Sequence, residues 1–401
     1  MSTPPRIETE ADRVSAPEAP ADAPRTNRWY LSSAPIVSAL LHLCVPMAAA
    51  MIVGAIYNLI NAGFIGSLDN TALLAAVTLG SPILGLVMGV GNVFGVGGGA
   101  LVSRLLGGAE HDPSKAATIK RVASYSLWGS VVAGAVVATG LANLVVVTYF
   151  VVWLTRNSEH VSLSPRWFTL AGSVQKPVLG VGVGTLLQSA FLIVTALVLN
   201  NLAAAYGEGP LAAMGVAVRI AQVPEFLIMG VTIGVLPLLA YSYGKGDGAR
   251  FGSALRASAI TVGAVAALAA TLVLCFRDQV FTLFVADESV LAVGVVVLAA
   301  QLIAMIANGF TGLITSLFQA TGRALPATIM SAAQGVLFIP VVIAGSIWLG
   351  LAGIIWALTV TEVAVLAVGV VLCVALAPAL KRGLAEGNAE RAEEALEMAA
   401  A

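Results

Sequence analysis

Besides residues 122–154, eight stretches of this chain run for 20 or more residues with at most two charged side chains, and these stretches most restrict how the chain can fold. A helix needs about 20 apolar residues to cross the hydrocarbon core of a bilayer. Hydrophobic residues make up 59% of the chain and charged residues only 10%, against about 25% charged in a soluble domain. We therefore expect an all-α, polytopic membrane protein and exclude a soluble enzyme. The stretches are 35–68, 71–103, 177–206, 210–244, 257–276, 289–322, 324–349 and 353–379.

Residues 122–154 contain 33 residues without a charge, which is long for one crossing and short for two. Lys and Arg collect in cytoplasmic loops. If the N-terminus lies inside and this segment crosses an even number of times, eighteen of the twenty basic residues lie inside. A single crossing would remove that bias. We expect a short hairpin that bends near residues 140–143, with one long tilted helix as the alternative, and 9–10 transmembrane helices in all.

The chain divides into two membrane lobes and three polar segments. Residues 1–34 are rich in Pro, Ala and acidic residues, which predicts a disordered tail. We expect transmembrane lobes over 35–155 and 177–380, joined by a cytoplasmic loop over 156–176. Residues 381–401 are Ala- and Glu-rich and predict a cytoplasmic tail.

An internal repeat relates the two lobes at an offset of 137 residues. Because both copies begin on the same side, the repeat is parallel, about an axis along the membrane normal. The second copy, with six helices, is longer than the first. The matching positions are residues 74–83 with 211–220, Gly97 with Gly234, Leu101 with Leu238, and Gly107 with Gly244.

Several short segments resemble the motifs of the multidrug and toxic compound extrusion (MATE) family, and its MepA-like branch in particular. The resemblance implies a two-lobe MATE-like helical bundle of twelve helices, of which this first lobe lacks roughly the fourth and fifth. The segments are YNLINAGFIG at 57–66, LAAVTLGSPI at 74–83, GVGGGALVSRLLG at 95–107, PLLAYSYG at 237–244 and FQATGR at 318–323.

Three charged residues fall inside the apolar stretches: Arg219, Glu225 and Glu362. Charges at membrane depth are costly, so they are functional candidates by default. Glu225 could bind a proton, Na⁺ or a cationic drug, and the alternative is a structural carboxyl neutralised by burial or by Arg219. Glu362 and Arg219 could equally serve as packing or structural partners.

Uncharged polar residues complete the candidate ion-coupling and substrate-binding set. The resemblance implies an aspartate at Asn61 as the coupling carboxylate of the first lobe, and an asparagine there cannot ionise. The alternative for each such residue is hydrogen bonding between helices. These candidates are Asn61, Gln188, Asn201, Asn308 and Gln334.

The resemblance implies a secondary active antiporter that exports drugs or amphipathic organic cations, driven by a Na⁺ or H⁺ gradient. The alternatives are a degenerate, weakly active or inactive relic or membrane scaffold, and an exporter of one endogenous metabolite. We expect no enzyme activity, no cofactor, no metal cluster and no nucleic-acid partner. The bacterial cytoplasmic membrane is the expected location, with both termini cytoplasmic. A homo-oligomer is expected if the short first lobe is real.

Overall fold

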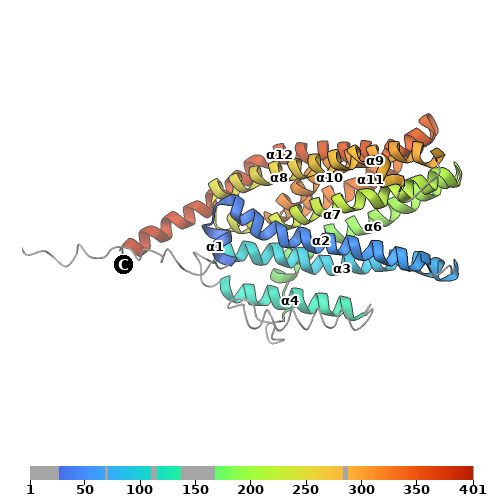
Figure 1. The fold of residues 1–401 in the computed structure, drawn as a ribbon. Coiled ribbons are helices and arrows are strands. Elements are labelled where there is room, and N and C mark those ends of the chain that lie inside the picture. The colour runs from blue at the N-terminus through green and yellow to red at the C-terminus, as the bar shows by residue number, and fades with distance from the viewer. Residues whose placement is uncertain (1–26, 68–70, 110–114, 137–167, 283–287, 401) are drawn as a thin grey trace, which may run out of the picture.

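The computed structural model describes residues 27–67, 71–109, 115–136, 168–282 and 288–400. These residues form a bundle of long helices without a strand in the described ranges (Figure 1). The helices are α1 (Asn27–Ser32), α2 (Ile36–Ser67), α3 (Thr71–Gly108), α4 (Lys115–Val136), α6 (Gly172–Ala204), α7 (Glu208–Gly244), α8 (Gly248–Cys275), α9 (Arg277–Thr282), α10 (Glu288–Ala320), α11 (Ala324–Leu349) and α12 (Leu351–Ala400).

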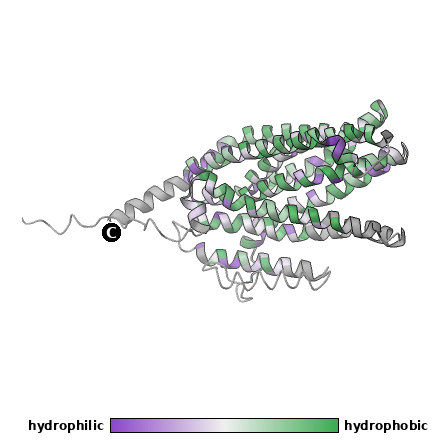
Figure 2. Cartoon of the chain, in the orientation of Figure 1, coloured by the Kyte–Doolittle hydropathy of each residue, from purple (hydrophilic) through white to green (hydrophobic). Residues whose placement is uncertain are grey.

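Eight of these helices are long and apolar enough to span a membrane: α2, α3, α6, α7, α8, α10, α11 and α12. Each coincides with one of the eight apolar stretches, so the expected all-α membrane fold is confirmed. Figure 2 shows apolar residues along most of the length of the bundle. The predicted hairpin within 122–154 lies outside the described residues beyond Val136.

Helix ends differ from the expected boundaries because hydropathy marks where a helix enters lipid, not where it begins. The prediction of a disordered tail over 1–34 is wrong for residues 27–34. Helix α1 packs against α7, and Arg250 of α8 donates a hydrogen bond to the carbonyl oxygen of Leu31 at the end of α1. The start of α6 at Gly172 lies inside the expected 156–176 loop. The last helix continues to Ala400, because Ala and Glu are strong helix formers that need no lipid.

Among the described residues, the first two helices of each lobe contact the other lobe far more than they contact each other. Helix α2 lies along α7 and α3 lies along α6, whereas α2 and α3 contact each other little. Small residues make this possible, because close packing is the main attraction between helices in lipid. A Cβ added to Gly234 would lie 2.7 Å from the Cα of Cys44, and one added to Gly182 would lie 2.2 Å from the carbonyl oxygen of Val93.

The ends of α3 and α7 cross in a reciprocal contact that reproduces the 137-residue repeat. A Cβ on Gly107 would lie 2.2 Å from the carbonyl oxygen of Tyr241, and one on Gly244 would lie 2.0 Å from that of Arg104. The 137-residue offset relates Gly107 to Gly244 and Arg104 to Tyr241. The two contacts are therefore equivalent under the repeat. This is the contact pattern of a pseudo-two-fold axis running between the lobes.

One end of the bundle gathers the segments that the sequence places in the cytoplasm. Arg250, near the start of α8, reaches the turn after α1. At the opposite end, the turn after α6 meets the turn after α11, where Tyr206 lies against Gly350. The remaining contacts at the first end are Gly108 with Gly244 and Lys115, Gly322 with Arg104, Gly180 with Ala324, and Gly383 with Tyr243.

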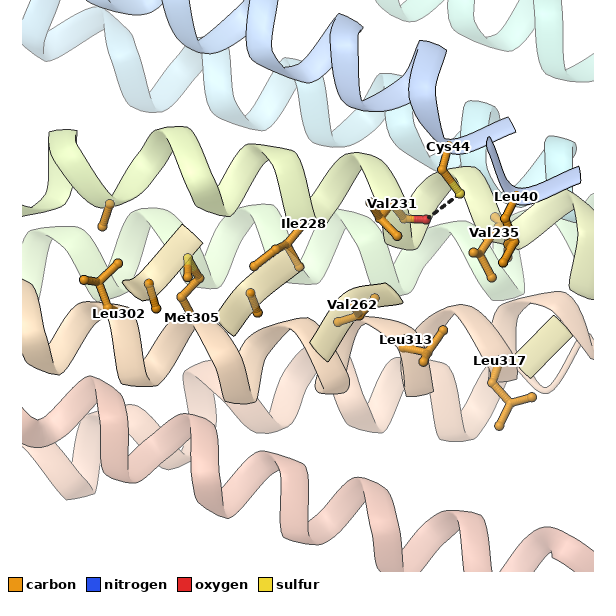
Figure 3. Packing of buried hydrophobic residues seen from close by; sticks show 14 of the residues in the cluster. Leu40, Cys44, Ile228, Val231, Val235, Val262, Leu302, Met305, Leu313 and Leu317 are labelled. Carbon is orange, nitrogen blue, oxygen red and sulfur yellow. Dashed lines mark hydrogen bonds between the residues drawn. The ribbon is translucent and has the colours of Figure 1, made fainter. Parts of the chain in front are cut away.

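The core lies where α2, α7, α8 and α10 meet (Figure 3). The Cys44 thiol on α2 donates to the carbonyl oxygen of Val231 on α7 at 3.6 Å. On the other side of α7, the Ser316 hydroxyl of α10 donates to the carbonyl of Thr232 at 3.1 Å. Both bonds satisfy a side-chain donor in apolar surroundings while joining two helices.

A reporter inserted at Gly246 should lie in the cytoplasm, and one inserted at Gly207 should lie outside. Gly246 falls in the turn between α7 and α8 at the basic end, and Gly207 in the turn between α6 and α7 at the other end. An enzyme reporter active only outside the cytoplasmic membrane measures this directly. Activity at Gly246 would contradict the orientation derived from the basic residues.

Candidate functional site

A buried carboxyl group lies in the middle of the second lobe, between α11 and α12. Glu362, on the twelfth residue of α12, has only 1% of its side chain exposed. The amide nitrogen of Gln334 on α11 donates a short hydrogen bond to its Oε1. Its Oε2 is buried without a hydrogen-bond partner in the described part of the chain. A hydrogen bond therefore joins Gln334 and Glu362, which the sequence analysis singled out as separate candidates.

A second carboxyl group, Glu225 on α7, is exposed although it lies near the middle of a 37-residue helix. Helix α7, which carries Glu225, contacts α12, which carries Glu362. Arg219, also exposed, forms no ion pair with either carboxyl group among the described residues. The alternative in which Arg219 neutralises Glu225 is therefore not realised in this structure.

The other predicted polar residues lie on separate parts of the bundle. Asn201 is exposed near the end of α6 and donates to the carbonyl of Leu197 in its own helix at 2.9 Å. Gln188 is exposed in the middle of α6, and Asn308 is half-buried on α10. The backbone of Asn61 lies in α2, but its side chain is outside the described residues. Asn201, Gln188 and Asn308 form no hydrogen bond with the Glu362–Gln334 pair within the described chain.

Arg250 forms a contact that sequence reasoning missed. Its guanidinium donates to the carbonyl oxygens of Leu31 at 2.7 Å, Ala34 at 2.9 Å and Tyr30 at 2.9 Å. The carbonyls at the end of a helix have no partner within it, so a fork of donors can cap them. The sequence showed Arg250 only as one of several basic residues near the membrane, with no signal for its partners.

Within the described residues, no group of three or more His, Cys, Asp or Glu side chains could hold a metal ion. The chemistry that the pair on α11 and α12 can perform with its own atoms is proton binding and release. Glu225 can in addition attract a cation electrostatically. We call Glu225, Gln334 and Glu362 the acidic cluster.

Comparison with known proteins places this arrangement in context. Residues 181–343 match the MatE family model. The chain is similar to the Multidrug export protein MepA of Staphylococcus aureus and to that of Staphylococcus haemolyticus. Each is 25% identical over 423 residues, covering 83% of this chain and 92% of the relative. Since 83% of 401 residues is about 333, about 90 of the 423 aligned positions are gaps in this chain.

Solved structures show the same fold. A MATE in its bent conformation superposes with a TM-score of 0.77 at 17% identity, covering 90% of this chain and 99% of that one. The outward-facing conformation of a multidrug resistance MATE family transporter of the MOP superfamily gives 0.75 at 16%, covering 88% and 98%.

Proposed function

Because this chain carries a MatE domain and has the fold of the MATE transporters, we propose that it exports small molecules across the bacterial cytoplasmic membrane. The substrates are drugs or amphipathic organic cations. A gradient of Na⁺ or H⁺ drives export by antiport. The similarity to multidrug export proteins over 83% of the chain supports export over a scaffolding role.

The exposed carboxylate of Glu225 carries the proposal about substrate charge. Seventeen residues of α7 precede it and nineteen follow it, so it lies about 25 Å from the start of the helix and about 28 Å from its end. Charged side chains at such depth face a water-filled space rather than lipid, because lipid would not solvate them. An anionic group in a water-accessible, low-dielectric space attracts organic cations.

The coupling ion binds in the second lobe rather than the first. Asn61 lacks the carboxyl group that the MATE resemblance implies at its position, whereas the second lobe retains Glu225 and Glu362. A proton or Na⁺ needs a group that can become anionic or offer oxygen ligands. Glu225 and Glu362 are the carboxyl groups in the middle of the second lobe's described helices.

A short first lobe is part of the same proposal. About 90 gapped positions equal the length of two long helices with their connections, which the first lobe is proposed to lack. A cavity missing one wall would open to lipid, where polar groups lose their enclosure. The chain then transports weakly by itself, or a second copy covers the open side as a homo-oligomer.

Changing Glu225 to glutamine should lower the rate of cation export about tenfold or more, because the isosteric amide cannot attract a cation. Everted membrane vesicles loaded with a fluorescent cationic dye measure the rate at matched protein level. Glu386→Gln is the matched control, because it makes the same change at an exposed site beyond the bundle. Equal export by the Glu225 variant and wild type would contradict the role of Glu225, and no export by wild type would contradict the function.

A further inference from the structure

Two arginines from different lobes approach each other at the end of the bundle that the sequence places in the cytoplasm. Arg104 lies four residues before the end of α3, and its guanidinium rests on Gly322 in the turn between α10 and α11. A Cβ on Gly322 would overlap the Nη1 atom of Arg104, so glycine leaves the room that the guanidinium occupies. Arg323 follows directly in the chain, with its Cα about 3.8 Å from that of Gly322. The turn therefore brings a second cationic side chain beside the first.

Neither arginine is neutralised within the described chain. The Nε atom of Arg323 is buried without a hydrogen-bond partner there, and Arg104 forms no hydrogen bond or ion pair with a described residue. The described carboxyl groups at this end belong to Asp247, which accepts from the backbone N–H of Arg250, and to Glu386, which is exposed. Buried donors in folded proteins nearly always have a partner. The two arginines therefore offer unused donors and two positive charges to an anion.

The donors of this pair suit a phosphate group. A guanidinium presents a planar fork of N–H groups that binds phosphate oxygens through two parallel, charge-assisted hydrogen bonds. Arg323 also stands at the N-terminus of the 26-residue helix α11 and does not cap it with its side chain. The positive end of that helix dipole adds to the attraction for an anion.

The depth of the pair in the membrane indicates lipid as the source of the phosphate. Helix α11 has 26 residues and is about 39 Å long, close to the thickness of about 40–45 Å for a bilayer with its headgroups. Its first turn, directly after Arg323, therefore lies at the level of the headgroups. Leu325 on that turn is 71% exposed, and Ile329 one turn later is also exposed. An acyl chain can lie against these residues while the headgroup reaches the arginines.

We propose that Arg104 and Arg323 bind the phosphate group of an anionic phospholipid of the cytoplasmic leaflet, with its acyl chains along α11. Because Arg104 belongs to the first lobe and Arg323 to the second, this lipid binds only while α3 touches the turn between α10 and α11. By linkage, the bound lipid favours that arrangement of the lobes. The proposal goes beyond the proposed function, because it requires no transported cation and no ion gradient.

Melting temperatures of the purified protein in detergent, with and without added lipid, test the site. Anionic phosphatidylglycerol should raise the melting temperature of the wild type by about 5 °C more than zwitterionic phosphatidylcholine does, because a ligand of the folded state stabilises it. Arg104→Gln and Arg323→Gln should each lose at least half of this difference. Arg256→Gln makes the same change at an exposed position of α8 and should keep the difference. Each variant is compared with itself, so a change in its basal stability does not affect the result.

Two variants that keep both charges separate a shaped site from general attraction between charges. The methyl group of Gly322→Ala would displace the guanidinium of Arg104, so the lipid-dependent difference should fall as it does in Arg104→Gln. Arg104→Lys keeps the charge but loses the planar fork, and its difference should be intermediate. If Gly322→Ala yields no folded protein, Arg104→Lys alone decides this point.

Inorganic phosphate at matched ionic strength distinguishes the source of the anion, and it should raise the melting temperature no more than chloride does. Equal stabilisation by phosphate and by phosphatidylglycerol would assign the site to free phosphate and overturn the lipid. An unchanged lipid-dependent difference in both glutamine variants, or an equal loss in Arg256→Gln, would show attraction to diffuse charge only. Equal effects of the two lipids on the wild type would likewise overturn the proposal.

Discussion

Replacing Gly244 by alanine should strongly destabilise the protein, because the new methyl group would lie 2.0 Å from the carbonyl oxygen of Arg104. Backbone atoms cannot move aside as a flexible side chain can, so α3 and α7 must separate. Overpacking of this kind typically costs about 1–3 kcal/mol, and it exceeds the gain of about 1 kcal/mol from replacing glycine inside a helix. The yield of monodisperse protein and its melting temperature in detergent measure the effect.

Gly215 provides the matched control, because it lies in the same helix and an added Cβ would have no neighbour within 4 Å. Gly215→Ala should leave the melting temperature unchanged or raise it slightly. Gly107→Ala should behave like Gly244→Ala, and Gly99→Ala is the corresponding open position in α3. Similar melting temperatures for all four variants would contradict the reciprocal crossing of α3 and α7.

Replacing Arg250 by alanine should release α1 from the rest of the bundle. The change removes three hydrogen bonds to the carbonyls of Tyr30, Leu31 and Ala34. Bonds to a charged group contribute about 1.5–3 kcal/mol each, and short helices such as the six residues of α1 are not stable alone. Limited proteolysis near Trp29 should become at least tenfold faster, which N-terminal sequencing of the fragments would locate.

Two further variants serve as controls for Arg250→Ala. Arg256→Ala removes the same side chain from an exposed position later in α8, where it has no hydrogen bond or ion pair within the described chain, and it should leave the cleavage rate unchanged. Arg250→Lys keeps the charge but loses the planar fork that reaches three carbonyls at once, so its rate should be intermediate. Cleavage at the wild-type rate in Arg250→Ala would show that α1 is held by its other contacts.

The helices could be predicted because lipid imposes one simple rule. A segment such as 324–349 must be apolar and helical to cross, and the turn after it is marked by Gly350, whose φ is 59°. The ordered helix α1 could not be predicted, because its partner Arg250 is more than 200 residues away in sequence. The repeat offset was visible in sequence, but the reciprocal contact of its glycines requires the orientation of the lobes.

The acidic cluster could be predicted as residue types but not as a group. Charge at membrane depth alone singles out Glu225 and Glu362. Gln334 stood in a set of polar residues with no sign that it, rather than Asn308 or Gln188, bonds to a carboxyl group. The pairing depends on the rotation of α11 against α12, and near-uniform apolar helices do not encode that rotation in their hydropathy.

The cross-lobe packing of α2 on α7 and of α3 on α6 has a consequence for biogenesis. A ribosome delivers α2 and α3 to the bilayer well before α6 and α7 exist, and they contact each other little. Both helices are therefore inserted in lipid before their partner helices are made. Glycine-lined faces, such as the one around Gly97, are not yet covered by α6. The first lobe is completed only when the second is synthesised, so quality-control proteases have their best opportunity while translation is still in progress.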